Sequence, residues 1–278
     1  DYLSNATADF RSGDSQGAVE VWFRSSSVAN EQCIFGSSDT ATTTSFFNFA
    51  IRGTTGLPFV RQQNAAGAVD TVTGSTNVCD GEWHSIVLSS SGTLWTFIVD
   101  GVVETASILG GANSGDWFAD TTLRDNLTQG AMTHTSNIDF AIGEIGFTRI
   151  YSRPMLQPEA QLNYQRGRKA AASDTTGLVF NLPCTEGTGN PVDTVGSLTM
   201  TLTGATWVEG LMDRSTNALP LTSFGSPVWG NTGRTFAGDD YIKNNYSSHL
   251  NISSELTVIY WAYPTTIGNL ADIQNGDL

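Results

Sequence analysis

Apolar and polar residues alternate along most of this chain with a period of two. In residues 198–203, Leu198, Met200 and Leu202 share one face, and the threonines between them share the other. Clusters of Gly, Ser, Asn and Asp separate such runs and are typical of turns. The pattern predicts half-buried β-strands at residues 19–24, 46–52, 84–88, 94–99, 145–151 and 178–182.

Two short turns and one helix complete the predicted elements. Residues 90–92 (Ser-Ser-Gly) and 100–101 (Asp-Gly) lie beside predicted strands, and Asp-Gly suits the positive φ angles of a tight hairpin. A short helix is expected from near Pro158 to just before Gly167. So little helix excludes the α/β classes, and the sequence predicts an all-β fold of antiparallel strands.

A segment near the start of the chain recurs 239 positions downstream. Residues 1–3 (Asp-Tyr-Leu) return as residues 240–242 (Asp-Tyr-Ile), and three later residues keep the same phase: Val19, Trp22 and Ile34 return as Val258, Trp261 and Ile273. An internal repeat of this kind indicates an array of similar units. We expect one unit in residues 1–170 that lacks its N-terminal strands, and the N-terminal portion of a second unit in residues 177–278. The polar stretch 167–176 is expected to link them, and the chain to be a piece of a longer array.

Five segments carry a family resemblance: DGEWHSI at 80–86, TLWTFIVDG at 93–101, IGEIGFTRIY at 142–151, GLVFNLP at 177–183 and FAGDDYI at 236–242. Together they resemble laminin G-like domains, which have the concanavalin A-like lectin and glucanase fold. The resemblance implies an antiparallel β-sandwich of jelly-roll topology, in tandem copies, with one short helix. It also implies carbohydrate or calcium as ligand classes.

Three tryptophans lie in the middle of strand-like patterns. Trp22, Trp83 and Trp261 are each flanked by residues of the predicted strands, where large rings are usually buried. We therefore expect them to be core residues rather than platforms on which a sugar ring stacks.

The charge balance limits the classes of partner. The formal net charge is −14 and the sequence pI is about 4.4, although only 14% of the residues are charged. An acidic surface repels phosphate backbones and anionic lipid, which argues against nucleic acid. No apolar run reaches the length of about 20 residues that spans a bilayer, so we expect no membrane insertion in this segment.

The three cysteines do not settle the cellular compartment. Cys33, Cys79 and Cys184 follow no metal-ligand spacing. Either Cys33 pairs with Cys79 in a disulfide, or all three are thiols.

Catalytic patterns are weak in this sequence. A glycoside hydrolase needs two carboxylates flanking the sugar, and in a strand they would lie two or four residues apart. The nearest run, residues 137–144, has Asn137 where the first acid would stand and Glu144 out of phase with Asp139. The histidines, at positions 84, 134 and 249, are scattered, so we expect no catalytic residues and rank a glycoside hydrolase third among functions.

A long segment without strand pattern, residues 106–137, is the candidate ligand site. Loops of this length are often functional, and an aromatic ring beside acids and amides suits sugar recognition. We expect the ligand-binding residues to be Asn113, Asp116, Trp117, Asp120 and Asn126. Asp116 and Asp120 would equally serve a calcium ion, which prefers oxygen ligands. In the alternative interpretation, Trp117 and Phe118 only plug the open end of the sandwich.

Four Asn-x-Ser/Thr sequons permit N-glycosylation, at Asn5, Asn126, Asn245 and Asn251. The favoured hypothesis is an extracellular carbohydrate-binding or adhesion module in a tandem array on a cell surface, appendage or virion. Its partners would be glycans or neighbouring copies of itself. The alternative is a structural subunit of a filament, tail fibre or capsid decoration.

Overall fold

The structure is a computed structural model that describes residues 1–65, 67–168 and 170–207 in full. Further along the chain it describes the backbone of four short strands, β17 (Thr222–Phe224), β18 (Val228–Gly230), β19 (Gly233–Thr235) and β20 (Tyr241–Lys243). Contacts divide the chain into two compact units, Asp1–Val208 and Glu209–Leu278. The first unit holds both of the large sheets.

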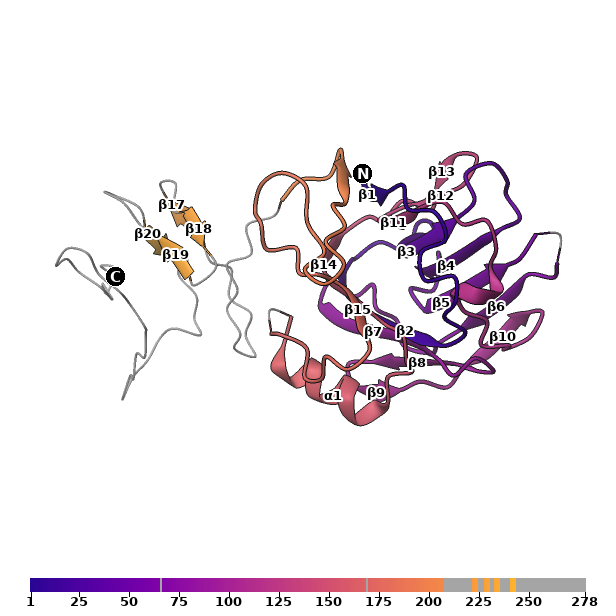
Figure 1. The fold of residues 1–278 in the computed structure, drawn as a ribbon. Coiled ribbons are helices and arrows are strands. Elements are labelled where there is room, and N and C mark those ends of the chain that lie inside the picture. Colours follow the sequence, from indigo (N-terminus) through magenta and orange to yellow (C-terminus); the bar gives the residue numbers. More distant parts are fainter. Residues whose placement is uncertain are drawn as a thin grey trace. The chain divides into compact units, whose positions relative to one another are not determined.

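An eight-stranded antiparallel sheet forms one layer of the first unit. Its strands lie in the order β10, β6, β5, β4, β3, β11, β1, β16 (Figure 1). Their bounds are β1 (Tyr2–Asn5), β3 (Gln32–Ser38), β4 (Phe46–Ile51), β5 (Pro58–Gln63), β6 (Asp70–Thr73), β10 (Ser107–Gly110), β11 (Leu127–Gln129) and β16 (Thr201–Thr203).

A six-stranded antiparallel sheet forms the facing layer. Its order is β15, β14, β2, β7, β8, β9 (Figure 1). Their bounds are β2 (Gly17–Arg24), β7 (Trp83–Ser90), β8 (Trp95–Val99), β9 (Val102–Val103), β14 (Glu144–Tyr151) and β15 (Leu178–Leu182). The two layers make the antiparallel sandwich that the sequence predicts, so the fold prediction is confirmed.

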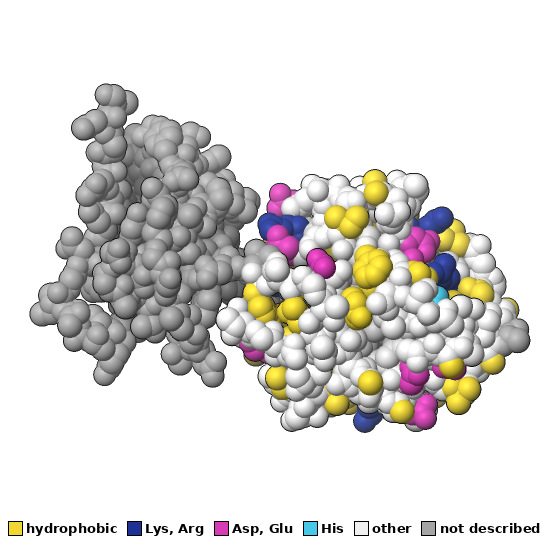
Figure 2. Space-filling model, turned by 90° about the horizontal axis from the view of Figure 1, so that it is seen from above, with side chains coloured by type: hydrophobic (Ala, Val, Ile, Leu, Met, Phe, Trp, Pro, Cys, Tyr) yellow, Lys and Arg dark blue, Asp and Glu magenta, His cyan; other side chains and the backbone are white. Residues whose placement is uncertain are grey.

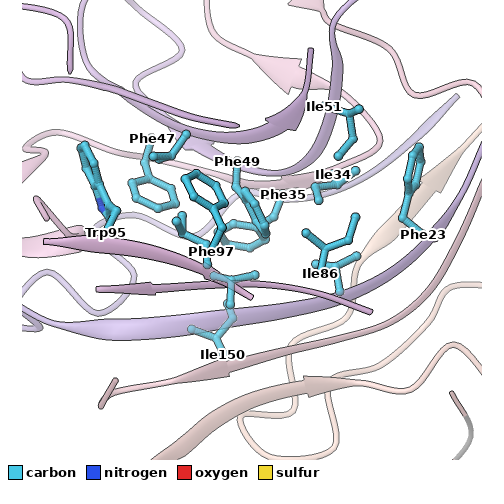
Figure 3. Close-up of a cluster of buried hydrophobic side chains, with 14 of the residues drawn as sticks. Phe23, Ile34, Phe35, Phe47, Phe49, Ile51, Ile86, Trp95, Phe97 and Ile150 are labelled. Carbon is cyan, nitrogen blue, oxygen red and sulfur yellow. The ribbon is translucent and has the colours of Figure 1, made fainter. Parts of the chain in front are cut away.

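The core lies between the two sheets and is rich in aromatic side chains. Phe47 and Phe49 of β4 point toward Phe97 of β8 from the opposite layer, and all three are fully buried (Figure 3). Successive strand residues point to opposite faces of a sheet, so the intervening Asn48 lies on the outer face. Alternation thus gives the eight-stranded sheet an apolar inner face and a partly polar outer one.

One helix, α1 (Gln157–Arg166), covers the outer face of the six-stranded sheet. Ala160 of the helix packs with Tyr151 of β14 and Val87 of β7 in a second apolar cluster. Pro158 lies in its first turn, and Gly167 at its C-terminus has a φ of 82°, a conformation that favours glycine. The helix prediction is therefore confirmed.

The segment 106–137 is not a structureless loop, so that prediction is wrong. It contains β10, the 3-10 turn η1 (Phe118–Asp120), β11 and β12 (Met132–Thr133), which pairs with β13 (Asn137–Ile138). β11 lies inside the eight-stranded sheet between β3 and β1. Strands of two to four residues are too short to show a period of two, which is why the pattern missed them.

The predicted boundary between residues 170 and 177 lies inside the first compact unit, which ends at Val208. β15 pairs with β14, and β16 pairs with β1, so residues 178–203 take part in the sheets of the first unit. Val258, Trp261 and Ile273, which carry the later part of the repeat, lie outside the described residues. The tandem repeat itself stays a prediction.

All three cysteines are thiols in this structure. Cys33 packs with Phe46 and Met132 on the outer face of the eight-stranded sheet, whereas Cys79 belongs to the core on the inner side. The two side chains therefore occupy different clusters, and the all-thiol alternative describes the structure.

Candidate functional site

The candidate site lies on the outer face of the eight-stranded sheet. Asn48 of β4 and Arg61 of β5 are register partners, and both side chains lie on the face opposite the core residues Phe49 and Val60. The Asn48 side chain is fully buried, and the Arg61 side chain keeps 30% of its surface exposed. A polar pair therefore stands on this sheet face.

Residues 130–142 lie against this face and contact the Asn48–Arg61 pair. Met132 of the β12–β13 hairpin packs on Cys33 and Phe46 of the sheet. The backbone oxygen of Asp139 accepts a hydrogen bond of 2.7 Å from the Cys33 N–H. Asp139 has a positive φ of 53°, a conformation that non-glycine residues adopt rarely. This backbone brings the Asp139 carboxylate to the sheet.

Three charged side chains then meet. Asp139 Oδ2 lies 3.1 Å from Asn48 Nδ2 and 3.4 Å from an Arg61 nitrogen. Glu31 approaches the other terminal nitrogen of Arg61 at 3.5 Å. One guanidinium therefore holds two carboxylates in place, and it fixes the polar wall of the site.

A surface hollow of about 310 Å³ opens beside these groups. Its lining combines polar side chains with two exposed apolar ones, and consists of Asn30, Glu31, Asp139, Phe140 and Ile142. Phe140 is 41% exposed and Ile142 is 47% exposed. The ring of Tyr2 lies 6.4 Å from the Phe140 ring, centroid to centroid, so a second aromatic side chain neighbours the hollow.

Several buried polar atoms near the hollow lack a hydrogen-bond partner among the residues that the structure describes in full. They are Asn48 Oδ1, Arg61 Nε and His134 Nδ1. Burial lowers the pKa of His134, and the charge of Arg61 acts in the same direction while Asp139 opposes it. Buried polar atoms are usually satisfied, so these three mark a polar interior directly behind the wall of the hollow.

Much of the surface of the first unit that Figure 2 shows carries little charge. Figure 2 views the first unit from the side on which β12 and β13 lie in Figure 1. Charged side chains of both signs stand there in small groups on a mostly neutral surface, with hydrophobic side chains scattered between them. A neutral, hydroxyl-rich ligand meets no strong electrostatic barrier on such a surface.

The residues predicted from the 106–137 segment have structural positions instead. Trp117 is fully buried in the main core and packs edge-on against Phe47 at 5.2 Å. Asn113 exchanges two hydrogen bonds with the Trp95 backbone. Asn126 is 5% exposed and bonds Ser38 and the Thr133 backbone. A ring without exposed surface cannot stack on a sugar, so Trp117 plugs the sandwich as in the alternative interpretation.

A buried arginine explains why this segment is fixed. Arg124 is 1% exposed and donates hydrogen bonds to the backbone oxygens of Phe10, Phe118 and Thr121 and to the Ser37 hydroxyl. Burial lowers its pKa to about 10. The arginine thereby satisfies carbonyl groups of a segment that the sequence alone reads as an open loop.

The calcium prediction for Asp116 and Asp120 gains no support from the geometry. Asp120 Oδ2 accepts the Trp117 backbone N–H at 2.9 Å, which is a turn-forming role. Burial raises the pKa of Asp116, and the charges of Asp120 and Asp70 add to this effect. Within the described part of the chain, no group of three or more His, Cys, Asp or Glu side chains is placed to hold a metal ion.

The four predicted N-glycosylation sites differ in their exposure and in whether the structure describes them. Asn5 is partly exposed and donates a hydrogen bond of 2.8 Å to the Thr199 oxygen. Asn126 is buried, which leaves no room for a glycan in the folded chain. Asn245 and Asn251 lie outside the described residues.

Sequence reasoning missed most of the hollow. The sequence marks Asp139 only as a possible carboxylate partner of Glu144, but Glu144 pairs with Arg24 in the other sheet. Asn48 and Arg61 were detectable as polar interruptions of apolar strands. Only the topology reveals that they meet Asp139, which lies 91 positions after Asn48 and 78 positions after Arg61.

The tryptophan predictions can be checked where the residues are described. Trp22 is 6% exposed and stacks on Tyr164 of α1 at 5.9 Å. Trp83 is partly exposed and lies between the guanidinium groups of Arg24 and Arg168, at 5.2 and 4.1 Å from its ring. Both lie on the outer face of the six-stranded sheet rather than in the central core. Trp261 lies outside the described residues.

Comparison with known proteins gives one family match. The model of the concanavalin A-like lectin/glucanases superfamily matches residues 1–161. No curated protein matches the sequence.

In the described part of the chain, no helix has the length and apolar character needed to cross a bilayer.

Solved structures with a similar fold include several proteins that act on or bind sugars. A putative carbohydrate-binding protein from Bacteroides ovatus is 14% identical with a TM-score of 0.50, over 72% of this chain and 55% of that one. The CBM40 of a Ruminococcus gnavus IT-sialidase is 14% identical with a TM-score of 0.46, over 54% of this chain and 83% of that one. A leech intramolecular trans-sialidase is 16% identical with a TM-score of 0.47, over 62% and 28% respectively. At these identities the likeness concerns the fold alone.

Proposed function

Because this chain belongs to the concanavalin A-like lectin/glucanase superfamily, we propose that it is a non-catalytic carbohydrate-binding module. The module would work outside a cell, in an array of similar units on a cell surface, appendage or virion. Linked weak sites gain avidity without any new contact, which suits a repeated module.

The hollow beside Arg61 and Asp139 is the observation that carries this proposal. The exposed Phe140 ring offers an apolar surface for the C–H face of a sugar, while Asn30, Glu31 and Asp139 offer polar groups for its hydroxyls. The buried unpartnered atoms of Asn48 and Arg61 lie next to the same carboxylate. This combination of ring and polar wall is what sugar recognition requires.

The arrangement supports binding better than hydrolysis. Hydrolysis needs one carboxyl group that is protonated and one that attacks or activates water. Glu31 and Asp139 both pair with the guanidinium of Arg61, so each carboxylate already has a structural ion-pair partner. Glu144 is paired with Arg24 in the six-stranded sheet. We therefore propose no catalytic residue.

A glycan panel with neutral and sialylated oligosaccharides tests the proposal. Phe140→Ala should weaken binding of any retained glycan about tenfold, which corresponds to ~1.4 kcal/mol. Tyr164→Ala is the matched control, because Tyr164 is an aromatic residue of similar exposure, 37%, on helix α1, which covers the other sheet. Panels with and without calcium separate a direct site from a metal-dependent one. Equal binding by the two variants, or no binding under any condition, would contradict the proposal.

A structural subunit is the second candidate, and the exposed edge strands favour it. β9 and β10 are the outermost strands of their sheets and expose Val102, Val103, Ile108 and Leu109, by 59, 44, 59 and 47%. An exposed apolar edge can pair with another chain. Sedimentation of the wild type and of Ile108→Lys would show concentration-dependent assembly that the charge abolishes. A monomer at high concentration would remove this candidate.

A further inference from the structure

Residues 177–203, which we name the closing segment, complete both sheets of the first unit. β15 forms the outer edge of the six-stranded sheet by pairing with β14 from Thr148↔Leu182 to Tyr151↔Leu178. β16 forms the outer edge of the eight-stranded sheet by pairing with β1. One continuous stretch thus closes the sandwich along one side (Figure 1).

The closing segment contributes to the main core and does not merely rest on it. Phe180, Leu182 and Met200 are 1, 0 and 2% exposed and belong to the same apolar cluster as Val19 and Ile150. Phe180 also meets Phe10 edge-on, with ring centroids 6.2 Å apart. Removal of these side chains would open the core to water.

By sequence, however, the closing segment precedes the second copy of the repeat. Asp240-Tyr241-Ile242 repeats Asp1-Tyr2-Leu3, and residues 177–203 come before that second copy. By its position in the repeat, the closing segment therefore belongs to the start of the second repeat unit. In the structure, however, it forms the last strands of the first unit.

The repeated strand has an antiparallel partner in both copies. β20 is the repeat counterpart of β1, and its Tyr241 pairs with Phe224 of β17. The counterpart Tyr2 of β1 pairs with Thr203 of β16, and both ladders are antiparallel with the same direction of register. The repeated strand is thus paired with β17 in one copy and with β11 and β16 in the other. Different segments can pair with this strand.

The closing segment also holds its own shape. Asp193 is 1% exposed, and its carboxylate accepts the backbone N–H groups of Asn181, Val195 and Gly196 at 2.7, 2.9 and 2.7 Å. The Asp193 N–H in turn donates to the Leu198 oxygen at 2.8 Å. The connection between β15 and β16 is therefore internally bonded, as a segment that moves as one piece requires.

We propose that the closing segment is a donated strand pair: residues 177–203 of one copy complete the sandwich of another, so that neighbouring copies of this chain's unit are joined by shared sheets. The sheet edges and core pocket that the closing segment occupies can accept the same segment from a second copy of the chain. The recognition elements are the edges of β14 and β1 and the core pocket for Phe180. This proposal does not depend on sugar binding.

A nicked full-length chain tests the proposal. A protease site inserted between Ala171 and Ala172, in the partly exposed stretch before β15, leaves the closing segment attached by non-covalent contacts alone. A fluorescent peptide of residues 175–205 is then added in excess, the mixture is taken briefly through partial unfolding in urea, and the products are weighed by native mass spectrometry. The expected product is the 1–171 fragment carrying the peptide, with fragment 172–278 released.

Two peptide variants distinguish specific incorporation of the closing segment from nonspecific association. Phe180→Asp places a charge in the core pocket and should reduce incorporation at least tenfold. Val195→Asp places the same charge at a position that is 46% exposed and should incorporate like the wild type. If the nicked chain unfolds, wild-type peptide should restore its circular dichroism. Equal incorporation of the two variants, or no incorporation and no restoration, would overturn the proposal.

Discussion

At the scale of single residues, the charged groups that matter most are buried ones in the six-stranded sheet. His84 of β7 is 8% exposed and lies between two carboxylates, with Nδ1 2.8 Å from Asp100 and Nε2 3.0 Å from Asp80. Burial lowers its pKa, but the hydrogen bonds and charges of Asp100 and Asp80 outweigh burial and raise the pKa to about 9. As an imidazolium, the residue therefore ties the start of β7 to the turn that follows β8.

This imidazolium contact makes stability depend on pH in alkaline solution. The pKa of His84 is higher in the folded state than the ordinary value of 6.5, so its contribution is complete below about pH 6.5 and is lost as the pH rises through about 9. His84→Gln should lower the thermal midpoint by several degrees at pH 6 and by little at pH 10. Thermal unfolding of both proteins across this range measures the effect, with His134→Gln as control. A difference that does not change with pH would contradict the imidazolium contact.

Glu20 is fully buried and acts in a lower pH range. Burial raises its pKa from 4.5 to about 7, although Arg149 at 3.4 Å and Asn163 at 3.2 Å oppose the shift. In the folded state the carboxyl therefore binds a proton at a pH where the unfolded chain has already released it. Stability should fall as the pH rises from about 4.5 to 7, because there the folded state holds more protons.

Glu20→Gln should remove this slope. Relative to the variant, the wild type is expected to lose stability between pH 5 and 8, by at most on the order of 3 kcal/mol. Urea unfolding at pH 5, 6, 7 and 8 measures the difference between the two proteins. Parallel curves would show that the carboxyl stays ionised beside Arg149 over the whole range.

At the scale of elements, the period of two predicted the strands that are apolar on one face and polar on the other. Residues 19–24, 84–88 and 178–182 fall inside β2, β7 and β15, and the Asp100-Gly101 turn has the positive φ angles expected of it, 51° and 79°. β3 was missed because its apolar residues Cys33, Ile34 and Phe35 are consecutive, so no alternation marks it. β11 was missed because it has three residues.

The candidate site was predictable only in part for the same reason. Sequence patterns describe contacts between residues a few positions apart, whereas the hollow joins Glu31, Arg61 and Asp139 from three distant segments. The aromatic and acidic residues of the 113–126 segment looked available because nothing in the sequence shows that Arg124 ties that segment to the core. Long-range hydrogen bonds of this type become visible only with the topology.

The connection between β15 and β16 depends on one carboxylate. Asp193→Ala removes three hydrogen bonds to backbone N–H groups and leaves those groups without an acceptor, which should cost about 3 kcal/mol. Asp193→Asn keeps one acceptor oxygen and should cost less. Urea unfolding gives the free energies, and hydrogen exchange at Asn181 reports the local loosening. An alanine variant as stable as the wild type would show that the connection holds without Asp193.

At the scale of the whole molecule, the main structural features lie in the first compact unit. The first unit contains both large sheets, the main core and the hollow, all within Asp1–Val208. The net charge of −14 is spread over few charged residues, so solubility depends largely on neutral polar side chains. Fold and candidate site therefore belong to the first unit.

A chain that ends at Val208 should behave as the first unit does in the whole chain. It keeps β15 and β16, and with them the buried Phe180 and Leu182, so its thermal midpoint and its glycan affinity in solution should equal those of the full chain. A chain that ends at Thr176 lacks the edge of each sheet and should lose the cooperative transition, because the core is then open beside β14 and β1. Calorimetry of both chains decides between two roles for residues 177–208. If the shorter chain melts like the longer one, these residues only lie against the sandwich; if it does not, they are part of the fold.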